Sequence, residues 1–241
     1  MKAVGAMLKA WDHLPQTMRR DAVRPYYDAL REKRASLVAK RLFDVVAGTV
    51  ALVPMLPVLL VIGAWVRLDS RGPALFRQVR VTQYGREFRI FKFRTMRVSR
   101  QGEGTQVTVS GDARITRAGK YLRAKRLDEL PQILNIIRGD MSFVGARPEV
   151  PKYVAHYTDE MMATLLLPAG VTSDCSLRYR DEGERLRGAQ DVDEAYVRVV
   201  LPEKMRYNLQ SLREFRLGGE FWVMVRTAQM VFSGKGGTED G

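Results

Sequence analysis

The longest apolar stretch of the chain lies near its N-terminal end. From Val45 to Val66 there are 22 residues without a charged side chain. As a helix they would extend ~33 Å, against ~30 Å for the hydrocarbon core of a bilayer. The length and the lack of charge predict a helix that lies in a membrane.

Two prolines and two basic flanks bear on how that helix enters the membrane. Pro54 and Pro57 lie in the middle of the stretch, where each proline removes a backbone donor and bends the helix. Lysines and arginines lie on both sides of it, and such residues prefer the cytoplasmic side. We therefore predict a re-entrant helix–break–helix over residues 40–68. The alternatives are an ordinary span across the bilayer and a buried helical hairpin of a soluble protein.

The residues before the apolar stretch have their own pattern. Residues 1–39 are basic, and apolar side chains recur at helical spacing from Leu8 to Met18, with Pro15 and Pro25 interrupting. This pattern predicts an interfacial helical lead-in, with a solvated helical arm as the alternative.

Residues 69–232 are predicted to form a cytoplasmic domain of the α+β class, mostly helical with a few short strands. The segments ALFRQVRV and EFRIFKFRTMRV are rich in branched and aromatic residues, so we expect two strands around a turn at Tyr84–Gly85. Residues 99–112 are polar and rich in glycine and serine, which predicts a loop.

Helical patterns dominate the rest of the domain. The elements expected there are helices over 114–138 interrupted near Asp128, a loop over 139–149, a helix around 150–165, a turn over 168–176, helices around 190–213 and 219–232, and a frayed tail over 233–241.

Composition and charge narrow the class of protein. The chain has 241 residues, of which 46% are hydrophobic, and this is enough for a sizeable core in one or two domains. Lys and Arg outnumber Asp and Glu by 40 to 27, which points to polyanionic partners such as nucleic acid, anionic lipid or phosphorylated small molecules. Cys175 is the single cysteine, so an intrachain disulfide is excluded, and with only two histidines the usual zinc sites are not expected.

Two adjacent acids, Asp128 and Glu129, carry the candidate chemistry. Nine basic residues and only two acidic ones lie between Arg94 and Arg126. Nearby positive charge lowers a carboxyl pKa, so we expect both acids to be ionised at neutral pH. An ionised Asp can attack phosphorus and an adjacent Glu can hold a divalent cation. The structural alternative is that Asp128 caps a helix and Glu129 occupies its first turn.

Four segments in this order resemble the bacterial sugar transferase family, the monotopic polyprenyl-phosphate phosphoglycosyl transferases. They are KRLFDVVAGTVALVPMLPVLL, FRIFKFRTM, RLDELPQILNIIRGDMSFVGARPEV and LLLPAGVTSDCSLRYRDE. The resemblance implies transfer of a sugar 1-phosphate from a UDP-sugar to undecaprenyl phosphate, with Mg²⁺ and release of UMP. It also implies a place on inner-membrane lipid, at the cytoplasmic face of the bacterial inner membrane.

The resemblance also implies roles for single residues. Asp128 would attack the β-phosphate and form a phosphosugar-aspartate, and Glu129 would bind Mg²⁺. Arg94, Arg123 and Arg147 would contact phosphate or organise the acidic pair. For Arg94 and Arg123 a structural ion pair is the alternative.

The chain departs from the family pattern in three places. Leu56 stands where a serine usually precedes the re-entrant proline, and the loop 145–148 lacks a first proline before Arg147. Residues 172–182 replace a common Gly-Trp-Ala-Gln segment where sugar or nucleotide selectivity could be set. The sequence therefore predicts no particular sugar.

Two other classes of protein compete with the transferase. The aromatic and basic residues of FRIFKFR alternate as in a nucleic-acid stacking platform. Nucleic acid is nevertheless not the expected partner, because the chain lacks a recognised nucleic-acid motif and the apolar stretch would stay unexplained. A non-catalytic membrane adaptor could use the same basic surface, and the intact acidic pair argues against it.

Overall fold

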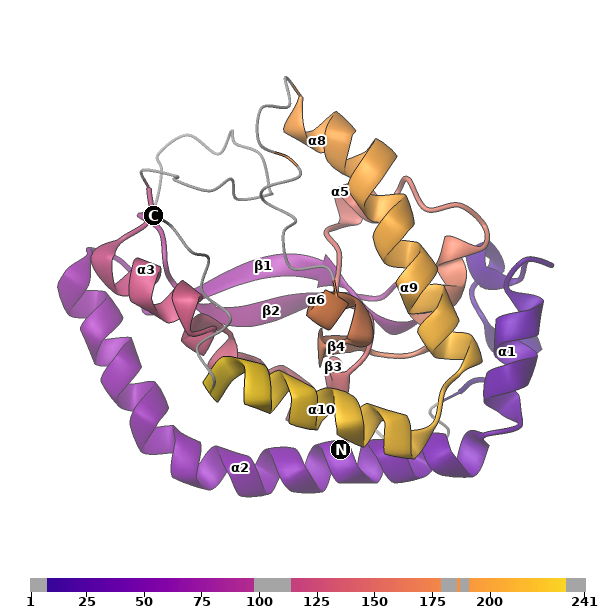
Figure 1. The fold of residues 1–241 in the computed structure, drawn as a ribbon, viewed down its shortest axis with the longest axis horizontal. Helices are drawn as coiled ribbons and strands as arrows, with labels where there is room; N and C mark the ends of the chain where they lie inside the picture. Colours follow the sequence, from indigo (N-terminus) through magenta and orange to yellow (C-terminus); the bar gives the residue numbers. More distant parts are fainter. Residues whose placement is uncertain (1–7, 98–113, 179–185, 187–190, 233–241) are drawn as a thin grey trace.

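The computed structural model describes residues 8–97, 114–178, 186 and 191–232 (Figure 1). Helices make up most of the described chain, and four short strands form two two-stranded sheets within it. The predicted α+β class with few strands is therefore confirmed. The loop expected over 99–112 and the tail over 233–241 lie outside the described residues.

Helix α2 (Arg34–Asp69) contains the whole apolar stretch. It is long and apolar enough to cross a membrane, and only 11% of its most apolar window is buried. Its buried side chains lie toward its two ends, whereas residues 49–61 include none. The alternative of a buried helical hairpin is therefore wrong.

The prolines of α2 bend the helix without ending it. Helical residues continue through Pro54 and Pro57, where we expected a break. Figure 1 shows that α2 bends strongly near its middle, so that its two arms follow two sides of the molecule. A proline within a helix commonly kinks it, because its ring clashes with the preceding turn.

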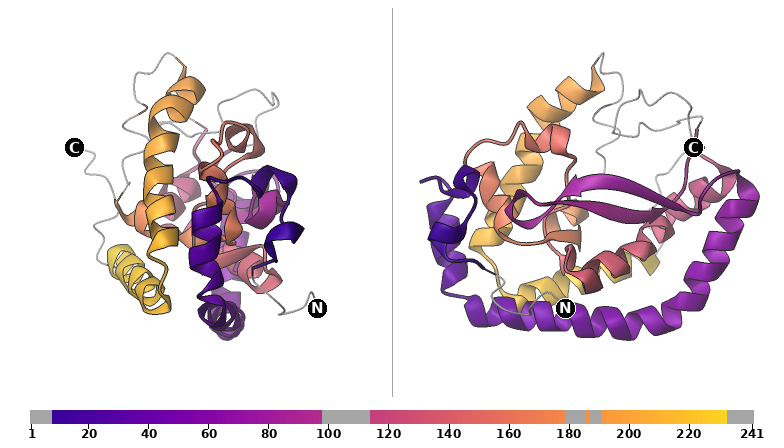
Figure 2. Two further views of the ribbon diagram at one scale, coloured as in Figure 1. Left: turned by 90° about the vertical axis from the view of Figure 1, so that its right-hand side faces the viewer. Right: turned by 180° about the vertical axis from the view of Figure 1, so that it is seen from behind.

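The segment before α2 packs into the protein. It forms two 3₁₀ turns, η1 (Trp11–His13) and η2 (Gln16–Met18), and the helix α1 (Arg24–Arg31). Leu8, Leu14 and Met18 are at most 3% exposed and belong to the largest hydrophobic cluster. These apolar side chains therefore face the core, and the interfacial position of the segment stays a prediction. Figure 2 shows this segment against the body of the protein.

The predicted hairpin is present. Strands β1 (Leu75–Val81) and β2 (Glu87–Phe93) pair antiparallel, with Leu75 opposite Phe93. Tyr84 and Gly85 in the turn have positive φ angles of 61° and 73°.

A second sheet was not predicted. Strands β3 (Met141–Val144) and β4 (Ala169–Thr172) pair in parallel where we expected a loop and a turn. Both strands have four residues, too few to display a period. The glycines that suggested turns mark a close approach instead: a Cβ on Gly170 would lie 2.1 Å from the nitrogen of Gly145.

The remaining elements are mostly helical. They are α3 (Arg117–Ala124), η4 (Leu127–Gln132), α4 (Ile133–Arg138), α5 (Pro151–Val154), η5 (Met161–Leu166), α6 (Asp174–Arg178), α8 (Val192–Ala195), the π-helical η6 (Tyr196–Val200), α9 (Leu201–Arg213) and α10 (Leu217–Phe232). The single helix expected around 150–165 is thus two short ones, α5 and η5. The helices expected around 190–213 and 219–232 are confirmed, and α10 runs beside the first arm of α2 (Figures 1 and 2).

Candidate active site

The acidic pair lies in the first turn of the 3₁₀ helix η4. Arg126 adopts a left-handed conformation with φ 54° between α3 and η4, and this residue occupies the N-cap position. The alternative in which Asp128 caps the helix is therefore wrong. Successive side chains of a 3₁₀ helix diverge by about 120°, so Asp128 and Glu129 point in different directions. One carboxylate can face a substrate while the other is held by the protein.

Three segments far apart in the sequence meet at Glu129. Its Oε1 accepts a hydrogen bond from Lys92 Nζ of β2 at 2.9 Å and one from Arg147 Nη2 at 2.6 Å. The Glu129 side chain is 10% exposed, whereas that of Arg147 is 34% exposed. Arg147 thus joins the buried carboxylate to the surface of the site.

The two carboxylates have opposite pKa shifts. Burial alone would raise the pKa of Glu129, but Arg147 and Lys92 hold it well below its usual range. Burial, with the charge of Glu129, raises the pKa of Asp128, although Lys92, Arg123 and Arg147 act to lower it. The expectation that positive neighbours lower both values is therefore wrong for Asp128. A carboxylate that has lost part of its hydration is a better attacking group once it is ionised.

The predicted basic residues fall into two groups. Arg147 contacts the acidic pair directly, and Arg123 is close enough to Asp128 to lower its pKa. Arg94 is 3% exposed, and its guanidinium donates hydrogen bonds to carbonyl oxygens of Ser70 and Arg71 at the end of α2. These contacts with backbone carbonyls, rather than a structural ion pair, are what the structure records for Arg94. Its contact with phosphate stays a prediction.

Lys92 was missed by the sequence reasoning. It lies two residues before Arg94 in the same FRIFKFRTM segment, so both are candidates from the motif alone. Arg94 lies just beyond the end of β2 and contacts the end of α2, whereas the packing of β2 against η4 brings Lys92 to Glu129.

The loop that carries Arg147 is anchored from behind. Glu149 Oε1 accepts hydrogen bonds from Tyr196 Oη at 2.6 Å and from Lys204 Nζ at 2.9 Å, and both side chains come from the η6–α9 helix. Burial would raise the pKa of Glu149, but Lys204 and Tyr196 lower it. Arg80 also donates to the carbonyl of Pro148. A buried and hydrogen-bonded ion pair thus fixes the backbone next to Arg147.

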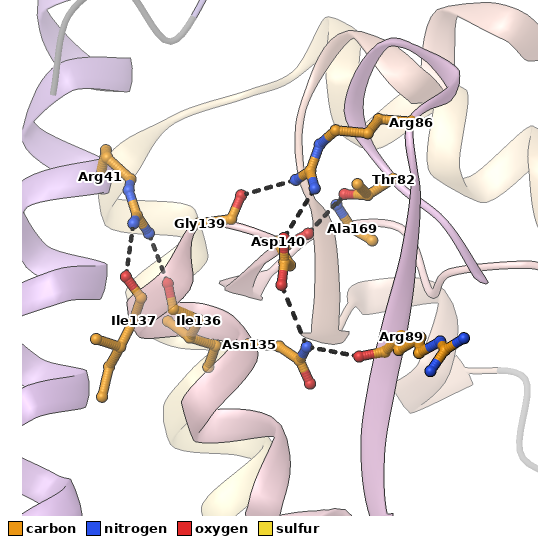
Figure 3. Close-up of polar contacts among 10 residues, drawn as sticks. All are labelled: Arg41, Thr82, Arg86, Arg89, Asn135, Ile136, Ile137, Gly139, Asp140 and Ala169. Atoms are coloured by element: carbon orange, nitrogen blue, oxygen red, sulfur yellow. Dashed lines mark hydrogen bonds and ion pairs between the residues drawn. The ribbon is translucent and has the colours of Figure 1, made fainter. Parts of the chain in front are cut away.

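Helix α4, which continues directly from η4, is tied to α2. Arg41 of α2 donates to the carbonyl oxygens of Ile136 and Ile137 at 2.8 and 3.1 Å, near the C-terminal end of α4 (Figure 3). At the other side Asn135 donates to the carbonyl of Arg89 on β2. The acidic pair is therefore held between the hairpin and α2.

The acidic pair suits a Mg²⁺ site in which the substrate supplies most of the ligands. Mg²⁺ prefers oxygen ligands and usually binds through one or two carboxylates together with substrate phosphates. Asp128 and Glu129 offer such oxygens, and the described residues contain no group of three or more His, Cys, Asp or Glu that would form a complete metal cage.

Comparison with known proteins assigns the sequence to a family. The model of the bacterial sugar transferase family matches residues 35–234, which include α2, the hairpin, η4 and the Arg147 loop. The chain belongs to this family. The resemblance carried by the four segments is thereby confirmed.

Three relatives of this chain are named as sugar-phosphate transferases that act on undecaprenyl phosphate. A UDP-glucose:undecaprenyl-phosphate glucose-1-phosphate transferase of Caulobacter vibrioides is 43% identical over 197 residues, which are 80% of this chain and 70% of the relative. A transferase of the same name from Xanthomonas campestris pv. campestris is 35% identical over 83% of this chain and 40% of its own length. A UDP-N-acetylgalactosamine-undecaprenyl-phosphate N-acetylgalactosaminephosphotransferase of Aeromonas hydrophila is 30% identical over 82% of this chain and 44% of its own length. The chain thus spans less than half of the last two relatives.

Proposed function

We propose that this protein transfers a sugar 1-phosphate from a UDP-sugar to undecaprenyl phosphate and releases UMP. The observation that carries the proposal is the acidic pair of half-buried Asp128 and buried Glu129, in which Lys92 and Arg147 fix Glu129. The names of the relatives support the substrates. Those names differ in the sugar, so the proposal covers the class of UDP-sugars.

In the first step an ionised oxygen of Asp128 attacks the β-phosphorus of the donor. The bond from that phosphorus to the bridging oxygen breaks, UMP leaves with the bridging oxygen, and a phosphosugar-aspartate remains. In the second step an oxygen of undecaprenyl phosphate attacks the same phosphorus, and Asp128 leaves as a carboxylate. The product is undecaprenyl diphosphate sugar, so the enzyme returns to its starting state.

The basic residues offset the negative charge of both steps. An anion attacks a diphosphate, so positive groups must already be in place when charge builds up on the departing phosphate. Lys92 and Arg147 are held by Glu129, and Arg123 lies within the electrostatic reach of Asp128. Glu129, with Asp128 beside it, would hold Mg²⁺, which supplies further charge neutralisation on the diphosphate when it is bound.

We further propose that α2 is re-entrant in the cytoplasmic leaflet of the bacterial inner membrane. The supporting observations are that none of residues 49–61 is buried, that α2 bends near its middle, and that both flanks are basic. The test is to replace Cys175 with serine, place single cysteines at the exposed Ala35 and Arg71, and label sealed vesicles from one side. The proposal predicts that both positions are labelled from the same side, and labelling from opposite sides would contradict it.

The activity is tested with a panel of donors. Membranes that contain the protein are mixed with Mg²⁺, undecaprenyl phosphate and single UDP-sugars, beginning with UDP-glucose and UDP-N-acetylgalactosamine, and UMP is measured. We expect UMP with at least one donor and none from the Asp128→Asn variant. A folded protein that releases no UMP with any donor would contradict the proposal and favour the non-catalytic adaptor.

A further inference from the structure

A pocket of about 310 Å³ lies between α2, β3 and α10. Its walls are almost entirely apolar. They are formed by Phe43 of α2, Phe143 and Val144 of β3, and Leu217, Phe221 and Met224 of α10.

Charged residues at one end of the pocket tie its three walls together. Lys40 of α2 donates a hydrogen bond to the carbonyl of Val144 at 2.8 Å and forms a buried ion pair with Glu220 of α10. Asp44 of α2 accepts a hydrogen bond from the nitrogen of Phe143 at 3.2 Å. Because each wall is held to another, the pocket is formed before a ligand arrives.

The charges at this end do not suit a phosphate. Two carboxylates, Asp44 and Glu220, face one ammonium group, Lys40. Asp44 Oδ2 is buried and has no hydrogen-bond partner among the described residues, so its charge is only partly compensated. An anion would be repelled, whereas hydrocarbon fits the apolar walls. The occupant is therefore the apolar part of a ligand.

The pocket opens beside exposed apolar residues, because Phe43 and Phe221 line it and are themselves exposed. Val46 and Val50 on α2 are exposed, and so are Phe221 and Trp222 on α10, at 56% and 64%. A chain that leaves the bilayer between these two helices therefore passes from one apolar environment into another, without crossing water.

One short segment of chain connects the pocket with the acidic pair. Val144 lines the pocket, and Arg147, three residues later, binds Glu129. Three residues of extended chain span at most about 11 Å. A ligand with its phosphate at the acidic pair and its hydrocarbon in the pocket would thus follow this short segment of the chain.

We infer that this pocket binds the isoprenoid chain of the prenyl phosphate acceptor near its phosphate end. The inference rests on the proposed function and adds a site for the acceptor. It makes β3 a shared element, because one end of the strand lines the tail pocket and the residues after it hold the acidic pair.

Gly218 allows the pocket to be filled without disturbing its walls. It lies in the first turn of α10 and lines the pocket, and a Cβ added there meets no atom within 4 Å. Gly219, the next residue, is also exposed but does not line the pocket. Gly218→Phe therefore adds bulk at the pocket without a clash, and Gly219→Phe is a matched control with the same change on the same helix.

The experiment measures two quantities on each variant in the full chain. The first is UMP released from donor alone, which reports the first step, and the second is KM for undecaprenyl phosphate. We expect Gly218→Phe to raise KM at least five-fold and to leave donor-alone UMP unchanged, while Gly219→Phe changes neither. The smaller Gly218→Leu should raise KM in the same direction, which keeps the test decisive if the phenylalanine variant fails to fold.

The outcomes separate this inference from the proposed function. If the parent protein releases no UMP with any donor, the proposed function fails. If UMP is released normally but KM is the same in all variants, the pocket does not hold the isoprenoid chain. Loss of co-purified phospholipid from Gly218→Phe with an unchanged KM would assign the pocket to an acyl chain instead, and would also overturn the inference.

Discussion

Replacing Lys92 with methionine tests whether the contacts of Glu129 serve the reaction. Methionine keeps most of the length of the side chain but removes the ammonium that lies 2.9 Å from Glu129 Oε1. Arg147 remains paired with the same oxygen at 2.6 Å, so Glu129 loses one of its two cationic partners and keeps the other. The variant therefore isolates one of the two contacts.

The size of the effect follows from the burial of the pair. The Lys92 and Glu129 side chains are 18% and 10% exposed, so solvent screens their interaction weakly. A hydrogen bond to a charged group contributes about 1.5–3 kcal/mol. At about 1.4 kcal/mol for each factor of ten, its loss lowers kcat/KM roughly 10- to 100-fold.

The dependence on pH gives this variant a second signature. Lys92 lowers the pKa of both carboxylates, so its removal raises the pKa of Glu129 and that of Asp128. The attacking form of Asp128 is the ionised one, which then persists only at higher pH. The acidic limb of the pH–rate profile is therefore expected to move upward.

The assay is UMP release from the donor across a pH series, with thermal unfolding as a check on folding. The control is Arg89→Met on the same strand, because the Arg89 side chain is exposed and its recorded contact to Asn135 uses only the backbone carbonyl (Figure 3). Activity within two-fold of the parent protein and an unmoved acidic limb would refute the reasoning. An equal loss in Arg89→Met would show that general positive charge, and not the Glu129 contact, is what matters.

Three further predictions concern other parts of the molecule. Arg94→Leu should lower thermal stability strongly, because it removes buried hydrogen bonds to the end of α2, and normal stability would contradict this role. The KM for donor, measured on the same variant, tests the phosphate contact, which predicts that this KM rises. Gly170→Ala should lower kcat and the unfolding temperature, because the added Cβ would lie 2.1 Å from the nitrogen of Gly145, in the chain leading to Arg147. Normal values of both quantities would mean that the loop can shift without changing stability or activity. Chelation with EDTA should abolish UMP release and added Mg²⁺ should restore it, whereas full activity in EDTA would exclude a required divalent cation.

The sequence predicted the elements that have a clear period or a distinctive motif. The β1–β2 hairpin has branched and aromatic residues on both sides of a Tyr-Gly turn, and α2 has a long run without charge, so each pattern is local. The β3–β4 pair has no such pattern. Its partners lie 28 residues apart in the register Met141 to Ala169, and their glycines serve the contact between two backbones rather than a turn.

The sequence predicted the residues of the candidate site that belong to recognisable motifs, but not how they contact one another. Asp128, Glu129 and Arg147 were named from the sequence, and the structure brings Arg147 to Glu129. The role of Lys92 depends on how β2 packs against η4, which no local pattern reveals. The raised pKa of Asp128 depends first on burial, and the positive charges along the sequence gave no sign of it.

The apolar residues near the N-terminus illustrate a different limit. Leu8, Leu14 and Met18 have a spacing that suits a membrane interface and a protein core equally well, because both environments exclude water. Only the presence of a partner surface decides between them. Here the partner is the cluster formed with α9 and η5, which includes Leu166 and Leu212.

The central claim is that Asp128 forms a covalent bond to the phosphosugar, and mass spectrometry of the intact protein tests it most directly. The protein is incubated with an accepted UDP-sugar and Mg²⁺ without acceptor, quenched and digested. We predict a mass increase of one sugar phosphate on the peptide that contains Asp128, absent from Asp128→Asn and lost on addition of undecaprenyl phosphate. Turnover of the same donor with no adduct on that peptide under any quench, and with UMP appearing only after the acceptor is added, would contradict the account.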